Sequence, residues 1–290
     1  MMIKASIVIL TWNSMDVIRA CLASLPHGLA RYSHEVIVVD NGSRDLTPAA
    51  VRYEFPWMRL VVNRRNVGVA RARNQGIWVS QGEYIILLDD DTVVQPGALD
   101  CLIGYLDAHP QVGLCAPKLV DHQGRLHLSC RLFPTVSDKL ARRLPFRVIQ
   151  QKKREAEMVD WDHRTTREVD YVIGACQGIR RTALADVGLL DERIFYGPED
   201  VDLCLRLQRA DWRVVYHPES VVLHLERRMT RSVLSALSWK HCWGVVYFFW
   251  KHRYLFSRRR LYAQLHHQRS TGNRQTVLDQ PTSSRLEADS

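Results

Sequence analysis

The first 120 residues alternate short, continuously apolar segments with amphipathic ones, and this order limits the fold more than any other feature of the chain. Buried strands are predicted at residues 5–10, 58–63 and 84–88, and within residues 34–43, where a strand runs into a turn. Helices are predicted by the segments that follow them, at residues 15–25, 47–55, 67–80 and 96–108. Strands that are apolar on both faces and are joined through helices predict an α/β fold with a mostly parallel central sheet flanked by helices.

Polar residues stand where these strands end. Thr11 and Asn13 come after the first strand, Asp40 ends the second, and Asn66 follows the third. In parallel sheets of this kind, ligands bind outside the carboxyl ends of the strands. We therefore expect these residues to belong to one binding site.

Three aspartates, Asp89–Asp91, come directly after the fourth strand, in "YIILLDDDT". A buried carboxylate without a partner costs several kcal/mol, so these charges need a cation. Because side chains of an extended chain alternate between faces, Asp89 and Asp91 point one way and Asp90 the other. Mg²⁺ and Mn²⁺ bind carboxylates together with phosphate oxygens, so the pattern predicts a divalent metal that carries a nucleoside diphosphate. The plainer alternative is that the aspartates end the strand and cap the next helix.

The second half of the chain is less regular. We expect strands around a turn at 112–130, a polar, basic loop with some helix at 135–168, a strand, a tight turn and a helix at 171–188, a helix at 199–210, and two short strands at 212–225. In the helix 199–210, Asp202 and Arg206 are spaced to pair on the outer side. Glu199 and Asp200 fall in its first turn, where acids favour the helix dipole, and this alone would explain both.

Six segments resemble glycosyltransferase family 2 in content and in order: "SIVILTWNS", "VIVVDNGSRD", "NVGVARARNQG", "YIILLDDDT", "VGLLDERIFYGPEDVDLCLR" and "VVLH". The resemblance covers roughly residues 4–232. It implies a Rossmann-like, type-A glycosyltransferase fold with a catalytic domain at residues 1–232, and an inverting, metal-dependent transfer from a nucleotide sugar, expected to be UDP- or dTDP-linked. The family includes bacterial rhamnosyl- and galactofuranosyltransferases, so a glycan or a polyprenyl-linked acceptor is expected.

The resemblance also implies roles for individual residues. Asp200 falls at the family's catalytic-base position, and Glu199 beside it is expected to orient the acceptor or the base. Metal binding, with Mg²⁺ or Mn²⁺, is implied for Asp89, Asp91 and His224. Nucleotide-sugar binding is implied for Thr11, Asn13, Asp40, Asn66, Arg73 and Asp90. Asp191 is expected to be structural or to lie on the acceptor side.

Plainer explanations stay open for several of these residues. Asp40 precedes an Asn-Gly turn and can be a turn residue, and Asn66 can be the N-cap of the next helix. Arg73 can be a surface charge, and His224 can be a structural histidine after an apolar strand. The chain departs from the family after this histidine, where relatives often carry glycines and this sequence has Arg227, Arg228 and Arg231.

A basic and aromatic segment, "WKHCWGVVYFFWKHRYLFSRRR", occupies residues 239–260. The net charge of +9 is concentrated at residues 139–154 and 226–269. A helical extension at 233–269 that packs on the domain is one explanation, and an interfacial helix on an anionic membrane surface is the other. No zinc-finger spacing or aromatic RNA-binding strand accompanies the charge, so nucleic acid is not an expected partner. The polar tail at 270–290 is expected to be disordered.

The sequence also bears on where the protein acts and on rival functions. Seven scattered cysteines without a Cys-x-x-Cys pair indicate reduced thiols, and neither a signal peptide nor a run of about 18–20 apolar residues is found. We therefore expect a cytoplasmic protein that is peripheral on the inner face of the cell membrane. A nucleotidyltransferase acting on sugar phosphates and a nicotinamide dehydrogenase are rivals, but both call for a glycine-rich loop, which "TWNSMDV" lacks. A non-catalytic, nucleotide-binding membrane scaffold is a third rival, which only turnover would separate from an enzyme.

Overall fold

A computed structural model describes residues 2–136, 147–225, 236–254 and 257–265. The helices are α1 Ile18–Gly28, α2 Thr47–Glu54, α3 Val69–Val79, α4 Ala98–Ala108, α6 Arg147–Ala156, α7 Arg181–Val187, α8 Glu199–Arg209 and α9 Ala236–His252, followed by a short helix over 258–265. The strands are β1 Ala5–Thr11, β2 His34–Asp40, β3 Arg59–Val62, β4 Tyr84–Asp89, β5 Thr92–Val94, β6 Val112–Val120, β7 Leu126–His127, β8 Cys130–Arg131, β9 Arg167–Glu168, β10 Tyr171–Val172, β11 Cys176–Arg180 and β12 Arg213–His224.

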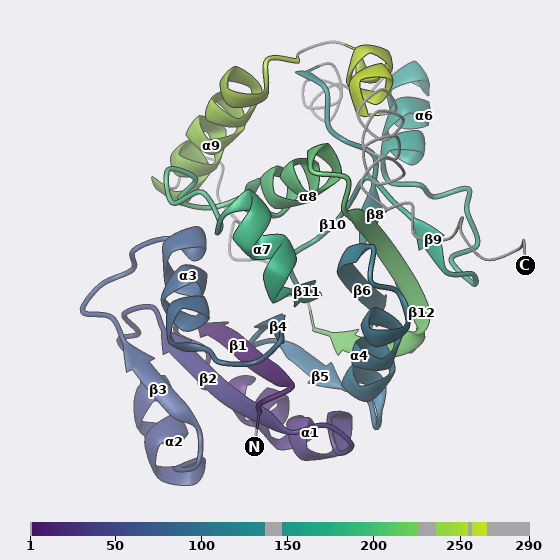
Figure 1. Ribbon diagram of the computed structural model, residues 1–290. Coiled ribbons are helices and arrows are strands. Elements are labelled where there is room, and N and C mark those ends of the chain that lie inside the picture. The colour runs from purple at the N-terminus through teal and green to yellow at the C-terminus, as the bar shows by residue number, and fades with distance from the viewer. Residues whose placement is uncertain (1, 137–146, 226–235, 255–256, 266–290) are drawn as a thin grey trace, which may run out of the picture.

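One large sheet forms the centre of the molecule, with a sheet of two strands, β8 and β10, beside it (Figure 1). The strand order of the large sheet is β3–β2–β1–β4–β11–β6–β12–β5, and β7 and β9 pair with β6 and β12. All strands of this order except β11 and β5 run in the same direction, since β4 and β6 are both antiparallel to β11. The prediction of an α/β fold with a mostly parallel sheet is confirmed.

Helices cover both faces of the sheet, which explains why its strands are apolar along their whole length. Val8 and Val39 face a core that they share with buried residues of α3, α7 and α8. Ile7 and Val38, their neighbours in sequence, face a second core that they share with α1 and α4. Successive side chains of a strand point to opposite faces, so a strand with helices on both sides must be apolar at every position.

Strand β11 differs from the prediction, which placed a helix directly after the turn at residues 174–175. Residues Cys176–Arg180 instead form a strand between β4 and β6, antiparallel to both. Gly178 permits the close packing of this strand, because a Cβ at this position would lie 2.8 Å from Leu102 Cδ2 of α4. The strand is five residues long and runs straight into α7, so its periodicity does not separate it from the helix.

Residues 212–225 were expected to form two short strands, and this expectation is wrong. They form one long strand, β12, in which Pro218 has no N–H to donate and the register with β6 shifts between His217 and Val221. The strand resumes after this bulge and ends at His224, which pairs with Thr92 of β5. The bulge therefore interrupts the pairing without ending the strand.

Helix α9 packs beside α8 through a buried ionic cluster (Figure 1). Asp202 of α8 accepts hydrogen bonds from Arg206 Nε (2.8 Å) and Lys251 Nζ (2.6 Å), and His252 Nε2 lies 2.8 Å from it. The expected Asp202–Arg206 pair forms, but its expected place on the outer side is wrong, because α9 covers Asp202 completely. Lys251 also donates to Asp191 (2.8 Å), which gives that carboxylate a structural contact.

Helix α9 has two chemically different faces. Phe248 and Phe249 are buried against the domain, whereas Trp239, Trp243 and Trp250 are exposed. The two explanations of the basic aromatic segment, packing on the domain and an exposed aromatic surface, therefore apply to opposite faces of one helix.

Some expectations fall on residues that the structure does not describe. These are the tail at 270–290 and the arginines after β12, Arg227, Arg228 and Arg231. Within the described ranges, no helix is long and apolar enough to cross a bilayer.

Replacing Asp202 tests the attachment of α9 to α8. Burial alone would raise the pKa of Asp202, but the contact with His252 and the charges of Arg206 and Lys251 hold it down to about 2. Asp202→Asn leaves these cations without a carboxylate and is expected to lower the free energy of unfolding at pH 7 by about 3 kcal/mol in urea titrations. A depressed pKa stabilises the fold above the unfolded value and loses this effect as pH falls, so the difference should shrink below about pH 4.

The matched control is Glu54→Gln, which breaks an exposed pair with Arg19 (2.6 Å). This substitution is expected to leave the unfolding midpoint unchanged, because water already solvates both groups. Equal effects of the two substitutions would contradict the structural role of Asp202.

Candidate active site

The acidic segment at the end of β4 meets the end of β12. Asp89 is the last residue of β4, and β5 then pairs antiparallel with β12, which brings His224 next to the aspartates. The ligand atoms of Asp89, Asp91 and His224 all lie within 4.8 Å of one another. Strand parity selects the same two aspartates from the sequence alone, and Asp90 points elsewhere.

The ring of His224 is held between two partners. Its Nε2 lies 3.4 Å from Asp91 Oδ1, and its Nδ1 lies 3.0 Å from Nδ1 of His127, which stacks on it with 4.9 Å between ring centroids. One of the two facing nitrogens must donate and the other accept, so His127 fixes the ring with Nε2 toward the acidic cluster. Sequence reasoning missed His127, because β7 has only two residues and no recognisable period.

A buried guanidinium, that of Arg73 in α3, contacts the cluster through Asp89. Its Nη2 donates to Asp89 Oδ1 (2.6 Å) and to Gly174 O (2.8 Å), and its Nη1 lies 3.7 Å from Glu199 Oε1. Arg73 is almost fully buried, so the surface-charge explanation is wrong. Burial raises the pKa of Asp89 and the charge of Arg73 opposes this rise.

Asp90 points toward the end of β1 instead. Its Oδ2 accepts the backbone N–H of Trp12 (3.3 Å). Burial raises the pKa of Asp90 to about 6, although the hydroxyl groups of Ser14 and Thr11 lower it in part. The side chains of the three aspartates therefore point in two directions. Asp89 and Asp91 lie on the side of His224, and Asp90 lies on the side of β1.

Helix α8 begins with two acids, Glu199 and Asp200, which line the same cleft as the aspartates. Glu199 is buried, and burial together with the neighbouring charge of Asp200 raises its pKa to about 7, against the attraction of Arg73. Its Oε2 has no hydrogen-bond partner within the described part of the chain. Asp200 is only partly buried, so of the two carboxylates it is the one that a ligand reaches more easily.

These groups line one cleft of about 580 Å³. Of the residues expected from the sequence, eight line it: Asn66, Arg73, Asp89, Asp90, Asp91, Glu199, Asp200 and His224. The cleft lies where the strands end, as expected for a parallel sheet, and its wall combines five carboxylates with one buried guanidinium.

Three residues expected to bind the nucleotide, Thr11, Asn13 and Asp40, are not among those that line this cleft. Asp40 Oδ2 accepts the N–H of Ser43 (3.1 Å), as a turn residue does, while Oδ1 finds no partner among the described residues. Asn13 Oδ1 accepts the N–H of Arg44 (2.7 Å). Their binding roles stay predictions.

Asn66 lines the cleft and also has a structural contact. Its Oδ1 accepts the N–H of Gly68 (3.0 Å), and Gly68, not Asn66, is the N-cap of α3. The capping explanation of Asn66 is therefore wrong, although the residue does order the turn before the helix.

Comparison with known proteins decides the family. The family model described as glycosyl transferase family 2 matches residues 6–188. The chain belongs to glycosyl transferase family 2. It is similar to the N-acetylglucosaminyl-diphospho-decaprenol L-rhamnosyltransferase of Mycobacterium tuberculosis, with 30% identity over 257 residues that cover 81% of this chain and 80% of the relative. It is also similar to a pre-mycofactocin glycosyltransferase of the same species, with 31% identity over 79% of this chain and 44% of that protein.

Solved structures agree on the fold of this glycosyltransferase. One similar structure is the mannosyltransferase PcManGT from Pyrobaculum calidifontis in complex with GDP-Man and Mn²⁺, with a TM-score of 0.59 at 20% sequence identity. The match covers 92% of this chain and 69% of the mannosyltransferase chain. Another is GalNAc-T7 with UDP, GalNAc and Mn²⁺, with a TM-score of 0.62 at 15% sequence identity. This match covers 86% of this chain and 48% of the GalNAc-T7 chain. The glycosyltransferase therefore has the expected type-A fold, a central sheet flanked by helices with α9 as a C-terminal extension.

Two basic groups of the glycosyltransferase cleft escaped sequence reasoning. Arg131 reaches it from β8, and His241 reaches it from α9, where its Nδ1 lies 3.3 Å from Tyr196 O. Both come from segments that carry no family motif, so only the folded chain brings them to the acids. Together with Arg73 and His224, they place basic side chains beside the five carboxylates of the cleft.

Gly174→Ala tests whether the position of Arg73 holds the cleft together. A Cβ at residue 174 would lie 2.6 Å from Arg73 Nη1, so the buried guanidinium must shift from its position beside Asp89 and Gly174. We expect the free energy of unfolding to fall by about 1–3 kcal/mol, measured by urea denaturation. Gly104→Ala is the control, because its Cβ would make an ordinary 3.5 Å contact with Tyr32 and helix α4 favours alanine. An unchanged midpoint for Gly174→Ala would show that the guanidinium has room to move and would contradict this account.

Proposed function

We propose that the enzyme is an inverting glycosyltransferase that moves a sugar from a nucleoside-diphosphate donor to a hydroxyl of a lipid-linked glycan acceptor, with Asp200 as the base. One observation carries the proposal. Asp200 of α8 lines the same cleft as the cluster of Asp89, Asp91 and His224, although they come from separate elements. Family membership supports transfer of a glycosyl group over transfer of a nucleotidyl group.

The donor side is formed by Asp89, Asp91 and His224. Two carboxylates and one imidazole with ligand atoms within 4.8 Å of one another fit a divalent ion, Mg²⁺ or Mn²⁺. When bound, such an ion supplies positive charge for the departing diphosphate. Two relatives in fold were solved with Mn²⁺ and a nucleotide or nucleotide sugar, which supports the same chemistry here.

The acceptor side is formed by the first turn of α8. Asp200 takes the proton of the acceptor hydroxyl while that oxygen bonds to the anomeric carbon of the donor. The bond from this carbon to the diphosphate oxygen breaks at the same time, and the nucleoside diphosphate leaves. Attack opposite to the leaving group inverts the anomeric configuration. Arg73 keeps Asp89 and Glu199 in place during the step, because it contacts both.

The acceptor is proposed to be a polyprenyl diphosphate-linked sugar. This rests on the mycobacterial relative, whose name gives such an acceptor and an L-rhamnosyl donor group. The donor of this enzyme is accordingly proposed to be a dTDP- or UDP-sugar. Arg131 and His241 line the cleft and are suited to the diphosphate of either substrate.

Asp200→Asn is expected to lower the turnover number by about 100-fold or more, because an amide does not accept the proton. Turnover is measured as release of nucleoside diphosphate with a polyprenyl diphosphate-linked N-acetylglucosamine acceptor. Calorimetry with UDP or dTDP and Mn²⁺ should give the same affinity for variant and parent. The exposed Asp162→Asn, away from the cleft, is the matched control and should keep full turnover.

Full turnover in Asp200→Asn would refute the base assignment. Nucleotide binding by the parent without release from any donor would instead favour the non-catalytic scaffold.

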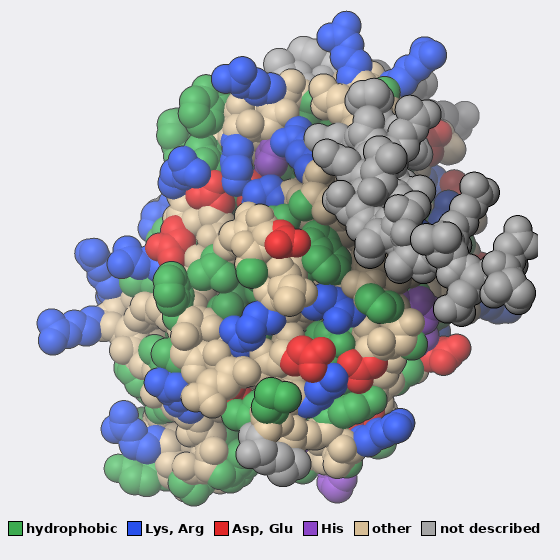
Figure 2. Space-filling view, in the orientation of Figure 1, with side chains coloured by type: hydrophobic (Ala, Val, Ile, Leu, Met, Phe, Trp, Pro, Cys, Tyr) green, Lys and Arg blue, Asp and Glu red, His purple; other side chains and the backbone are tan. Residues whose placement is uncertain are grey.

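A lipid acceptor also gives a reason for the exposed face of α9. Trp239, Trp243, Val246 and Trp250 are 71%, 67%, 59% and 71% exposed, and their spacing of four, three and four residues places them along one side of the helix. Figure 2 shows hydrophobic side chains together with Lys and Arg over the region of α9. Trp side chains prefer the headgroup level of a bilayer and basic groups attract anionic lipid, so we propose that this face, on the cytoplasmic side, rests on the membrane.

The triple variant Trp239→Ala, Trp243→Ala, Trp250→Ala tests this placement. Its partition onto vesicles with phosphatidylglycerol, measured by co-sedimentation, should fall at least about tenfold relative to the parent. The pair Trp57→Ala, Trp78→Ala is the control, because these tryptophans are also exposed (55% and 75%) but lie outside α9. Equal losses in both variants would contradict a specific role of α9.

A further inference from the structure

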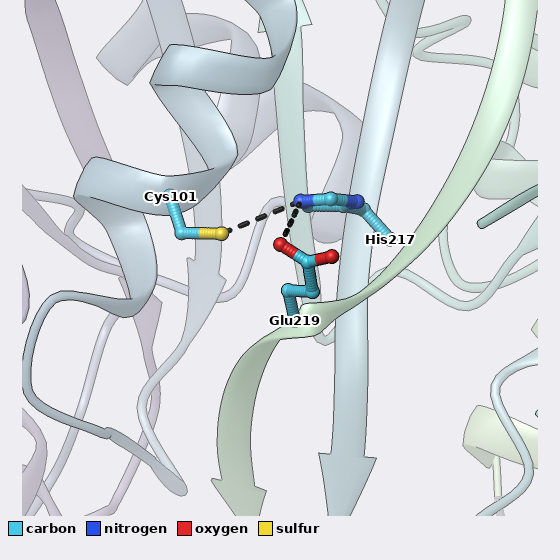
Figure 3. Close-up of side chains that lie close together, drawn as sticks. All are labelled: Cys101, His217 and Glu219. Carbon is cyan, nitrogen blue, oxygen red and sulfur yellow. Dashed lines mark hydrogen bonds and ion pairs between the residues drawn. The ribbon is translucent and has the colours of Figure 1, made fainter. Parts of the chain in front are cut away.

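A second cluster of metal-ligating side chains lies outside the active-site cleft. Cys101 Sγ is 3.3 Å from His217 Nε2, and the same nitrogen is 3.9 Å from Glu219 Oε2 (Figure 3). The three ligand atoms lie within 4.8 Å of one another, as in the acidic cluster of the cleft. None of the three residues lines that cleft, so the mechanism does not use them.

The imidazole of this cluster is oriented by its surroundings. Thr166 Oγ1 lies 2.9 Å from His217 Nδ1, and Tyr105 stacks on the ring with 4.4 Å between centroids. The hydroxyl can accept the Nδ1 proton, and in that tautomer the lone pair of Nε2 points toward Cys101. Outer contacts of this kind are common around histidines that bind metals.

The backbone that carries the ligands is held in place as well. His217 and Glu219 flank Pro218 at the bulge of β12, and Cys101 comes from α4. Ser220 Oγ donates to Ala98 O (2.8 Å), which ties the bulge to the first turn of that helix. Figure 3 shows the thiol and the carboxylate approaching the same edge of the ring from two elements.

We propose that Cys101, His217 and Glu219 form a Zn²⁺ site. Zn²⁺ binds a thiolate at about 2.3 Å and an imidazole nitrogen or a carboxylate oxygen at about 2.0–2.2 Å. The 3.3 Å between sulfur and nitrogen suits one such ion, and the exposed side chain of Glu219 can rotate to shorten its 3.9 Å separation from the nitrogen. Water completes the tetrahedron. Mg²⁺ and Mn²⁺ prefer oxygen ligands, so the thiol separates this site from the cluster of Asp89, Asp91 and His224. Binding deprotonates the thiol, and the ion joins α4 to β12.

Protection of Cys101 from alkylation tests the site. The parent protein is treated with iodoacetamide with and without Zn²⁺, and modified peptides are quantified by mass spectrometry. At ten times the dissociation constant of Zn²⁺, modification of Cys101 should slow about tenfold, because only the unoccupied fraction reacts. Cys242, which is exposed and distant in sequence, is the internal control and should react at an unchanged rate. Mn²⁺ at the same concentration as Zn²⁺ should not protect Cys101 from alkylation.

His217→Gln separates a metal site from simple shielding. This variant should keep the reactivity of Cys101 without metal and lose the protection by Zn²⁺. Co²⁺ in place of Zn²⁺ should give a thiolate charge-transfer band that is retained in Cys242→Ser and lost in Cys101→Ser. Equal protection of Cys101 and Cys242, protection that persists in His217→Gln, or no protection of Cys101 in the parent would each overturn the proposal.

Discussion

The contacts of Arg73 are the constraint on which the cleft depends. The cleft wall contains five carboxylates, and Arg73 is the buried guanidinium among them, in contact with Asp89 of β4 and near Glu199 of α8. Its bond to Gly174 O also fixes the turn that leads into β11. One cation therefore holds a helix, a strand, a turn and a second helix at the same point. It offsets only part of the negative charge, which leaves the site suited to a further cation together with phosphate.

The buried acids of the cleft lower the stability of the fold. Burial raises the pKa of Asp89 and brings that of Asp90 to about 6 and that of Glu199 to about 7. Groups whose pKa is raised in the folded state weaken it as the pH rises toward neutrality. Raised pKa values of this kind gather at functional sites, and these three acids line the same cleft.

The sequence alone predicted those parts of the structure whose signal is local. Continuous apolar runs predicted the parallel strands, and strand parity selected Asp89 and Asp91 over Asp90. The position of β11 in the sheet was not predicted. This short strand is distant in sequence from β4 and β6, and it lies between them. The sequence of a helix shows which of its faces is polar, but it does not show which other element covers that face. For this reason Asp202 was expected on the outer side. Arg131, His127 and His241 reach the site from separate elements, and no spacing in the chain connects them.

The ionic cluster around Asp202 joins two helices with different surroundings. Helix α8 carries Asp200 in its first turn, and α9 carries the exposed tryptophans, while Lys251 and His252 bind α9 to the same carboxylate of α8. With Asp200 as the proposed base and the tryptophans of α9 on a membrane, as proposed above, this connection would set the height of that carboxylate above the lipid surface. Under that proposal, the distance between the base and the membrane would favour acceptors whose reactive hydroxyl protrudes from the bilayer by the same length.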